Sequence, residues 1–406
     1  MPKEIDCPAF ASEAASLKSN LNGDIPVSVQ CSRFLGEEGV EEIQWIIRPE
    51  HYASFEVQLE WVHQAYERAV ESMGLKMDTA IWRKFLCSDL LNQSELLKAR
   101  PFSNPEDLSN TCAVSLVGQP PSAPAKLALW AQHIHDPSEP MRVSKQGDTL
   151  SLDRGELVHH WTTGLTSPNV EGAYAQTHGV FAQYDQVLRV NDLSLADHVV
   201  RTWFFSPNVD ADYAGLVEAR NEVFVQHGLT AETHFIASTG IEGRSSEVLA
   251  RSMMDAYAIE GLLPAQITYL RAEDYLSPTH IYGVAFERGT RIAYRDRSHI
   301  FISGTASVDS RGDILYRGDV LKQLERTLVN IEALLDEVSA SMENLQVMLV
   351  YLRDPNDHAV IREKLNQRFP DTPFEVVTGA VCRPGWLIEI EGFAVVINDD
   401  AEMPAF

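Results

Sequence analysis

The same order of strands and helices occurs three times along the 406 residues of this chain. In each copy a glutamine lies early in an expected helix, and a residue of the next expected strand follows 27 positions later. The three pairs are Gln58 and Phe85, Gln176 and Trp203, and Gln323 and Val350. Solenoid repeats have periods of only about 20–50 residues, so a longer repeat indicates duplicated domains. We therefore expect three modules of one fold.

The third copy shows the repeated unit most clearly. Residues 320–338 carry apolar side chains at positions 321, 324, 328, 331 and 335, a spacing that favours an amphipathic helix. Strand-like runs lie on either side of this helix, at 299–308 and 345–352, and a second helix is expected over 357–369. This order predicts that each module pairs a sheet with two helices.

Two polar stretches with proline and glycine, 136–156 and 272–280, separate the copies as linkers would. The fold class is expected to be α+β, with the modules packed around a pseudo-threefold axis as a pseudo-trimer and the helices outside a central core of sheets. The expected division is a leader over 1–24, a degenerate first module over 25–140, a second over 151–275 and a third over 279–406.

Charge and cysteine content limit the possible partners. The formal net charge of −25 argues against nucleic acid and anionic membranes. No apolar run approaches the length of a membrane span, and the first residues contain no hydrophobic signal segment. The five cysteines include no CxxC pair, so neither a disulfide framework nor a metal site is expected. We expect a cytoplasmic protein that needs no cofactor and is a monomer or a weak homo-oligomer.

The stretch 380–392 carries an unusual group of side chains. It predicts a β-hairpin with its turn at Pro384-Gly385, in which Glu389 and Glu391 share one face because alternate strand residues point the same way. Cys382 and Arg383 would lie across the turn from them. The simpler alternative is a solvated edge hairpin with two surface glutamates.

The third copy resembles the RidA/YjgF family. The resemblance rests on a strand with Ser303-Gly304-Thr305-Ala306, a helix start at Gly318-Asp319-Val320 with Gln323 and Asn330, and a closing strand over 387–392. Members of that family are single modules that form trimers with ligand clefts between subunits. Three fused modules would resemble such a trimer in one chain.

A closer resemblance, over roughly 200–392, is to the chorismatases, which have RidA-like modules and split chorismate. The matching motifs are Arg201-Thr202-Trp203, Tyr213 with Arg220, Ser238-Thr239-Gly240-Ile241, Tyr282-Gly283 with Phe286-x-Arg288, and Cys382-Arg383 with Glu389. Two features depart from the group. Leu216 and Val217 replace a Phe-Asn pair, and residues 308–311 follow the plain RidA pattern.

The chorismatase resemblance implies a hydrolase or lyase that removes pyruvate from chorismate, a small anionic metabolite. Glu389 would be the general acid, since burial can keep a carboxyl protonated. In that group a cysteine at the place of Cys382 goes with 3-hydroxybenzoate as product, and a small apolar residue with a dihydroxylated cyclohexadiene acid. Alternatively, Glu389 pairs with an arginine and only closes the sheet.

The two carboxylates of such a substrate need bidentate donors, which arginine supplies best. Each candidate arginine could instead be a surface ion-pair partner. The expected substrate-binding residues are Arg201, Tyr213, Arg220, Thr239, Gly240, Tyr282, Arg288, Gly304, Thr305 and Arg383.

Two other functions stay open. RidA-type deamination of enamines or imines relies on an arginine just before a Ser-Cys pair on the penultimate strand, and here residues 374–377 read Phe-Glu-Val-Val. A non-catalytic protein that binds a small metabolite is the second alternative.

Overall fold

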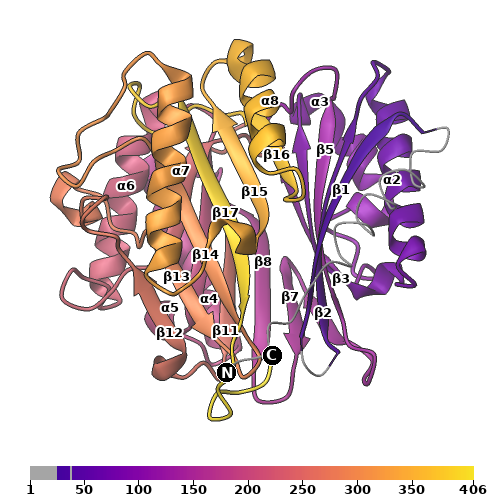
Figure 1. Cartoon of the computed structure of the whole chain (residues 1–406), viewed down its shortest axis with the longest axis horizontal. Coiled ribbons are helices and arrows are strands. Elements are labelled where there is room, and N and C mark those ends of the chain that lie inside the picture. The colour runs from indigo at the N-terminus through magenta and orange to yellow at the C-terminus, as the bar shows by residue number, and fades with distance from the viewer. Residues whose placement is uncertain (1–24, 37–38) are drawn as a thin grey trace, which may run out of the picture.

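The computed structural model describes residues 25–36 and 39–406, so the expected leader over 1–24 lies outside the described residues. Each third of the chain forms a sheet of its own (Figure 1). The first sheet has five strands, in the order β1 (Val27–Leu35), β2 (Glu41–Pro49), β5 (Leu127–His135), β3 (Ala80–Cys87) and β4 (Ala113–Val117).

The second and third sheets have six strands each and follow the same winding. The second has the order β6 (Arg142–Gln146), β7 (Thr149–Asp153), β8 (Val158–Thr166), β11 (Met253–Glu260), β9 (Val199–Ser206) and β10 (Ala237–Glu242). The third has the order β12 (Ile267–Leu270), β13 (Gly289–Ala293), β14 (Arg297–Ala306), β17 (Ile388–Ile397), β15 (Leu345–Leu352) and β16 (Phe374–Thr378).

The last two strands in each order are parallel, and the other neighbours are antiparallel. The helices cover the outer faces of the sheets in Figure 1. They are α2 (Phe55–Ser72) and α3 (Leu90–Lys98), then α4 (Ala173–Val190), α5 (Leu195–His198) and α6 (Val209–Gln226), then α7 (Val320–Asp336) and α8 (His358–Arg368). The α+β fold of three related modules is confirmed.

The three glutamines of the sequence repeat make the same contacts in each module. Gln58 donates to the carbonyl oxygens of His51 and Pro124 and accepts from the Lys126 amide. Gln176 does so with Val170, Leu249 and Arg251, and Gln323 with Tyr316, Gly385 and Leu387. Each buried amide thus joins the loop before its helix to the loop before the last long strand of its sheet. This satisfies backbone groups that would otherwise be buried unpaired.

The strand partner expected for Gln176 is wrong by one residue. Phe85 and Val350 are the sixth residues of β3 and β15, and the sixth residue of β9 is Phe204, not Trp203. The spacing in the second module is therefore 204 − 176 = 28. The parallel register agrees, because Phe204 pairs with Gly240 where Phe85 pairs with Leu116.

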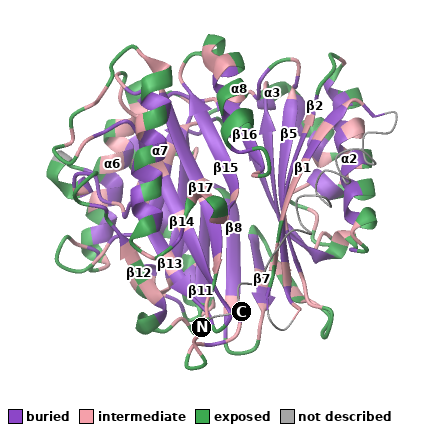
Figure 2. Cartoon of the chain, in the orientation of Figure 1, coloured by how far each residue is buried: buried purple, intermediate pink, exposed green. Residues whose placement is uncertain are grey.

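The three sheets meet in a shared core rich in aromatic side chains. Trp82 packs against Trp130 and Trp203, with ring centroids 5.0 and 4.7 Å apart. Trp161 and Tyr257 belong to the same cluster. Two further clusters fill the space under α2 and under α4 and α6. Figure 2 shows the strands largely buried and the outer faces of the helices exposed.

The expected hairpin around Pro384-Gly385 is wrong. β16 pairs in parallel with β15, and β17 pairs with β15 and β14, so β15 lies between the two strands. Residues 379–387 form a loop that crosses from one side of β15 to the other. Val381 of this loop bridges to Ile241 at the edge of the second sheet. The solvated edge hairpin is also wrong, because β17 is an inner strand and Glu389 and Glu391 are buried.

Candidate functional site

A cavity lies where the second and third modules meet. The second module contributes residues of α6 and β10, and the third contributes β14, the 379–387 loop and β17. The segment before β13 completes the wall. Eight of the expected site residues line this cavity, namely Tyr213, Arg220, Gly240, Arg288, Gly304, Cys382, Arg383 and Glu389.

Glu389 is a buried carboxyl, 5% exposed, on the cavity wall. It lies on β17 opposite Ala306 of β14 and Tyr351 of β15. Burial, and after it the nearby charge of Glu391, raise the pKa of Glu389 to about 8, and Arg288 and Arg201 act in the opposite direction. The side chain is therefore protonated at neutral pH and can give up a proton.

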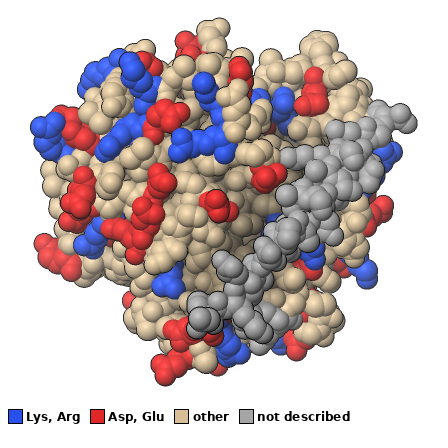
Figure 3. Space-filling model, viewed as in Figure 1, with Lys and Arg blue, Asp and Glu red and all other residues tan. Residues whose placement is uncertain are grey.

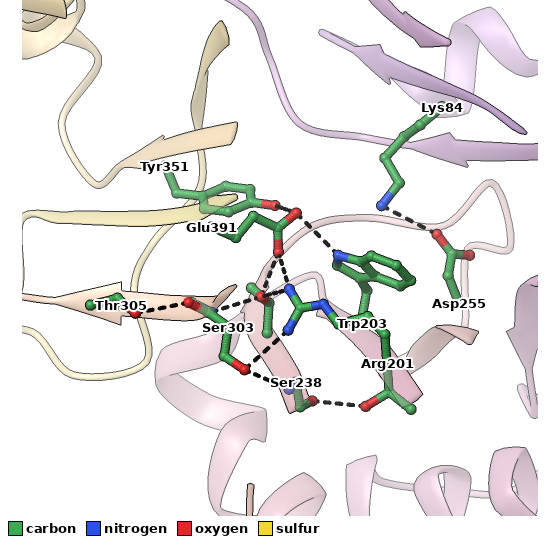
Figure 4. A network of polar contacts seen from close by, with 12 residues as sticks. Lys84, Arg201, Trp203, Ser238, Asp255, Ser303, Thr305, Tyr351 and Glu391 are labelled. Carbon is green, nitrogen blue, oxygen red and sulfur yellow. Dashed lines mark hydrogen bonds and ion pairs between the residues drawn. The ribbon is translucent and has the colours of Figure 1, made fainter. Parts of the chain in front are cut away.

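Glu391, two residues later on the same face of β17, has a different environment (Figure 4). Its Oε2 accepts hydrogen bonds from Arg201 Nη2 at 2.7 Å and from the Thr239 hydroxyl. Its Oε1 accepts from Trp203 Nε1 at 3.1 Å and from the Tyr351 hydroxyl at 3.0 Å. Four donors on two oxygens are the environment of an ionised carboxylate.

Three expected substrate-binding residues lie outside the cavity lining. Arg201 is directed to Glu391 and to Ser303 Oγ, and Thr239 bonds to Glu391 and the Gly304 amide. The Thr305 hydroxyl donates to the carbonyl oxygen of Ser303. The side chain of Tyr282 lies outside what the structure describes.

Three arginines line the cavity. Arg220 is 1% exposed, and its Nε and Nη2 atoms have no hydrogen-bond partner among the described residues. Arg288 donates to the carbonyl oxygen of Ser277 at 2.9 Å, and its guanidinium lies 5.3 Å from the Phe286 ring. Arg383 lies 5.3 Å from the Trp386 ring. A buried guanidinium without an anion is costly, so the cavity is suited to an anionic ligand.

These arginines are not part of a basic surface on the face drawn in Figure 3, where acidic and basic side chains are interspersed. In a chain with 33 Lys and Arg against 58 Asp and Glu, three arginines on one cavity form a local exception. Selectivity for a small anion would therefore arise inside the cavity.

Cys382 and Tyr213 both line the cavity from opposite sides of the module boundary, close enough to affect each other's pKa. Burial raises the pKa of the Cys382 thiol to about 12, and the charge of Glu389 acts in the same direction. Burial also raises the pKa of Tyr213 well above its usual value. Both groups are therefore neutral. A thiol in this state is a weak nucleophile, so Cys382 is suited to contact with a ligand rather than to covalent catalysis.

The 379–387 loop is held in place by the second module. The Ala380 amide donates to Glu242 Oε2 at 3.0 Å, and the Ala380 carbonyl accepts from the Glu242 amide. Arg353, directly after β15, donates to the Val381 carbonyl and forms two hydrogen bonds of 2.9 Å with Asp210 of α6. The position of Cys382 therefore depends on both modules.

Six further residues line the cavity that were not among the expected site residues: Ser238, Val284, Phe286, Ala306, Val308 and Trp386. Phe286 is flanked by Arg220 and Arg288. The Trp386 indole donates to the Ser307 carbonyl at 3.0 Å, which fixes its ring beside Arg383. Trp386 could have been identified from the sequence, because it is an aromatic residue three positions after Arg383 in the same loop.

Within residues 25–36 and 39–406, no group of three or more histidine, cysteine, aspartate and glutamate side chains is placed to hold a metal ion. In the same part of the chain, no helix has the length and apolar character needed to cross a bilayer.

Comparison with known proteins gives a consistent result. Residues 290–396 match the family model for endoribonuclease L-PSP. A RutC family protein of Pyrococcus abyssi is 33% identical over 97 residues, which cover 23% of this chain and 76% of that protein. A 3-hydroxybenzoate synthase of Streptomyces hygroscopicus is 30% identical over 216 residues, which cover 48% of this chain and 62% of that protein.

Among solved structures, a chorismatase superposes with a TM-score of 0.56 and 16% identity, covering 78% of this chain and 93% of that one. At this identity the superposition shows a shared fold. It extends the similarity beyond the third module, to which the family model is limited.

Proposed function

We propose that this chain, a member of the RutC family with the fold of a chorismatase, belongs to the chorismatase group and converts chorismate by removing pyruvate. The proposed ring product is a hydroxybenzoate, and Cys382 favours 3-hydroxybenzoate by its resemblance to the group. The relative from Streptomyces hygroscopicus carries the name 3-hydroxybenzoate synthase, which supports this choice.

The observation that carries the proposal is the protonated carboxyl of Glu389 in one cavity with three arginines. Chorismate has two carboxylates and an enol ether. Arginines bind carboxylates bidentately, and cleavage of an enol ether needs an acid that keeps its proton at neutral pH. Both requirements are met by side chains of this single cavity.

In the proposed reaction, Glu389 transfers its proton to the methylene carbon of the enolpyruvyl group, which becomes a methyl group. The adjoining carbon is left as a cation stabilised by the ether oxygen. Water adds to this carbon and returns a proton to the Glu389 carboxylate, which acts as general base in this step. The resulting hemiketal breaks into pyruvate and the ring alcohol.

Loss of one water molecule from the ring alcohol gives the aromatic hydroxybenzoate. The water that was added is thus released again, and the sum is one pyruvate and one hydroxybenzoate for each chorismate. Without this last step the product is a dihydroxylated cyclohexadiene acid. The neutral thiol of Cys382, which lines the cavity with Tyr213, is the group proposed to favour the aromatic outcome.

We propose that Arg220, Arg288 and Arg383 hold the two substrate carboxylates. Arg220 is the strongest candidate, since it is buried and two of its donor atoms have no partner among the described residues. Phe286 and Trp386, each beside an arginine, offer flat apolar surfaces for the ring. Arg201 has its carboxylate partner within the protein and is not assigned to the substrate.

The test is incubation of the purified protein with chorismate, followed by enzymatic measurement of pyruvate and mass spectrometry of the ring products. We expect equal amounts of pyruvate and hydroxybenzoate. Binding of chorismate without pyruvate release would support the binding-protein alternative. Ammonia release from an enamine substrate, without pyruvate from chorismate, would support RidA-type deamination.

A further inference from the structure

We propose that Glu391 is a fixed anion that keeps the catalytic proton on Glu389, and that Arg201 is the counterion that holds Glu391 in place. Both would be positioning residues that do not touch the substrate. The inference rests on the proposed function, because it assigns a task to Glu389, but the charge relationship can be measured without any substrate.

The hydrogen bonds distinguish the two glutamates. Both oxygens of Glu391 accept from two donors each, so a proton on either oxygen would point at a donor. Glu389 has no such partner among the described residues, and only burial and nearby charges act on it. One carboxyl is therefore built to be ionised, and the other is left to keep its proton.

The two carboxyls are close enough to influence each other strongly. Alternate residues of a strand lie roughly 7 Å apart on the same face. Glu389 and Glu391 are 5% and 3% exposed, so little solvent screens their interaction. A buried negative charge at this distance opposes a second one, which favours the neutral form of Glu389.

Other charged or titratable groups also face the pair. Arg201 from β9 and Arg288 from the segment before β13 favour ionised Glu389. Cys382 and Tyr213 are neutral, as is Tyr351 of β15 beside Glu391, whose pKa burial raises well above its usual value. The remaining groups are Arg220 and Arg383 across the cavity and Lys84 of β3, which interacts with Glu391.

Arg201 would have the opposite effect without Glu391. Its Nη1 donates to Ser303 Oγ and its Nη2 donates to Thr239 and Glu391, so the guanidinium is fixed by this network (Figure 4). With Glu391 neutralised, Arg201 would be a buried cation whose nearest remaining carboxyl on β17 is Glu389. Such a cation favours the ionised form of a neighbouring carboxyl.

The first interface of the molecule, between the first and second modules, provides an internal comparison. Asp255 of β11 lies there at the place of Glu391, since it pairs with Trp203 of β9 as Glu391 pairs with Leu349 of β15. It accepts from Ser115 at 2.6 Å and lies 3.4 Å from Lys84 Nζ. A paired acid in this position therefore occurs at two module interfaces.

The difference between the interfaces lies two residues earlier. Met253 pairs with Phe205 in the second module, whereas Glu389 pairs with Tyr351 in the third. At the first interface the paired acid, Asp255, joins two modules, and the residue two positions before it is Met253 rather than a carboxylic acid. In the third module the paired acid, Glu391, lies beside a second acid, Glu389. Its negative charge therefore acts on the group that is proposed to donate the catalytic proton.

The test is the variant Glu391→Gln, with the titration of the Glu389 carboxyl followed by the infrared band of protonated carboxyl groups. The Glu389→Gln variant identifies the band. We expect the midpoint to fall by about one pH unit or more in Glu391→Gln. Glu391→Asp retains the charge and should keep the midpoint of the wild type.

The matched control is Glu375→Gln. Glu375 is also fully buried and paired with arginines, Arg362 and Arg48, but lies on β16 at the interface of the third and first modules. This variant should leave the Glu389 band unchanged. Pyruvate release should show the same pattern, with its alkaline limit moved to lower pH only in Glu391→Gln.

An unchanged Glu389 midpoint in folded Glu391→Gln would overturn the inference. If Glu391→Gln does not fold, the wild-type protein is titrated instead. The carboxyl band that Glu389→Gln removes must then be present in the wild-type protein at pH 7. Its absence at that pH would equally overturn the inference. If no pyruvate is released from chorismate, the proposed function fails, while the infrared titration still answers the question about the two glutamates.

Discussion

Gly304 lies against the carboxyl of Glu389, so closely that a β-carbon at position 304 would come within 2.2 Å of Glu389 Oε1 and 2.8 Å of its Cδ. Thr239 Cγ2 would lie 3.1 Å from the same carbon. Any side chain at position 304 would therefore require the Glu389 carboxyl to move. The placement of Glu389 therefore depends on this glycine.

Gly304→Ala should displace the Glu389 carboxyl and lower the rate of pyruvate release by about 10²-fold, the usual cost of misplacing a catalytic group. Folding should survive, because the carboxyl borders a cavity into which it can move. The measurements are kcat for chorismate and the thermal unfolding midpoint. A variant with unchanged kcat would show that the position of Glu389 is unimportant.

Glu389→Gln should lower pyruvate release by about 10²–10⁴-fold, because a positioned general acid is lost. Substrate binding should persist, since glutamine keeps the shape of the side chain. Calorimetric titration with chorismate and a pyruvate assay separate the two effects. Release at the wild-type rate would refute the proposed mechanism even if chorismate is the substrate.

The rate of pyruvate release should fall as the pH rises through about 8, the pKa to which burial raises Glu389. The sign follows from the role, because an acid must be protonated at the start and its proton is present below the pKa. A plateau at neutral pH and a fall on the alkaline side are expected in kcat. A rate that rises through this range would indicate that Glu389 acts first as a base.

Cys382→Ala should leave pyruvate release measurable and shift the ring product from hydroxybenzoate to the dihydroxylated acid. The thiol is not a nucleophile in this environment, so its loss changes the fate of the ring rather than the cleavage. Mass spectrometry distinguishes the products, which differ by one water. An unchanged product ratio would remove Cys382 from this role.

Arg220→Met should weaken substrate binding and leave the protein at least as stable. The guanidinium is buried, and two of its nitrogens have no partner among the described residues, so an apolar side chain of similar length removes a desolvation cost. KM should rise about 30-fold or more, as expected when a buried charge contact of about 2 kcal/mol is lost.

The control for Arg220 is Arg368→Met on α8, where the ion pair with Glu325 is exposed. Exposed pairs contribute little, so KM and the unfolding midpoint should stay near those of the wild type. A large loss of stability in Arg220→Met would instead assign Arg220 a structural role.

The sequence alone was sufficient to predict the three related modules and the shared face of Glu389 and Glu391. Both follow from local periodicity, since the glutamine spacing and the alternation along a strand need no knowledge of tertiary contacts. The single extra residue before Phe204 was not visible, because one residue in a helix-to-strand connection leaves no signal in the composition.

The partner of Arg201 could not be predicted for a different reason. Arg201 and Glu391 are 190 positions apart. The sequence around a buried strand arginine does not distinguish one that binds a ligand from one that binds a carboxylate of the protein. The hairpin prediction failed because a Pro-Gly pair permits a tight turn but does not require one. β16 is the edge strand of its sheet, and β17 pairs with β14 and β15 instead of with β16.

Three modules joined by covalent linkers make the assembly of the cavity a first-order event. A cleft between separate subunits is lost on dilution, whereas here the second and third modules remain tethered at any concentration. Fusion also lets each interface diverge. Lys84 and Asp255 form an ion pair at the first, and Arg48, Glu375 and Arg362 cluster between the third and first modules. The expected stoichiometry is one substrate per chain.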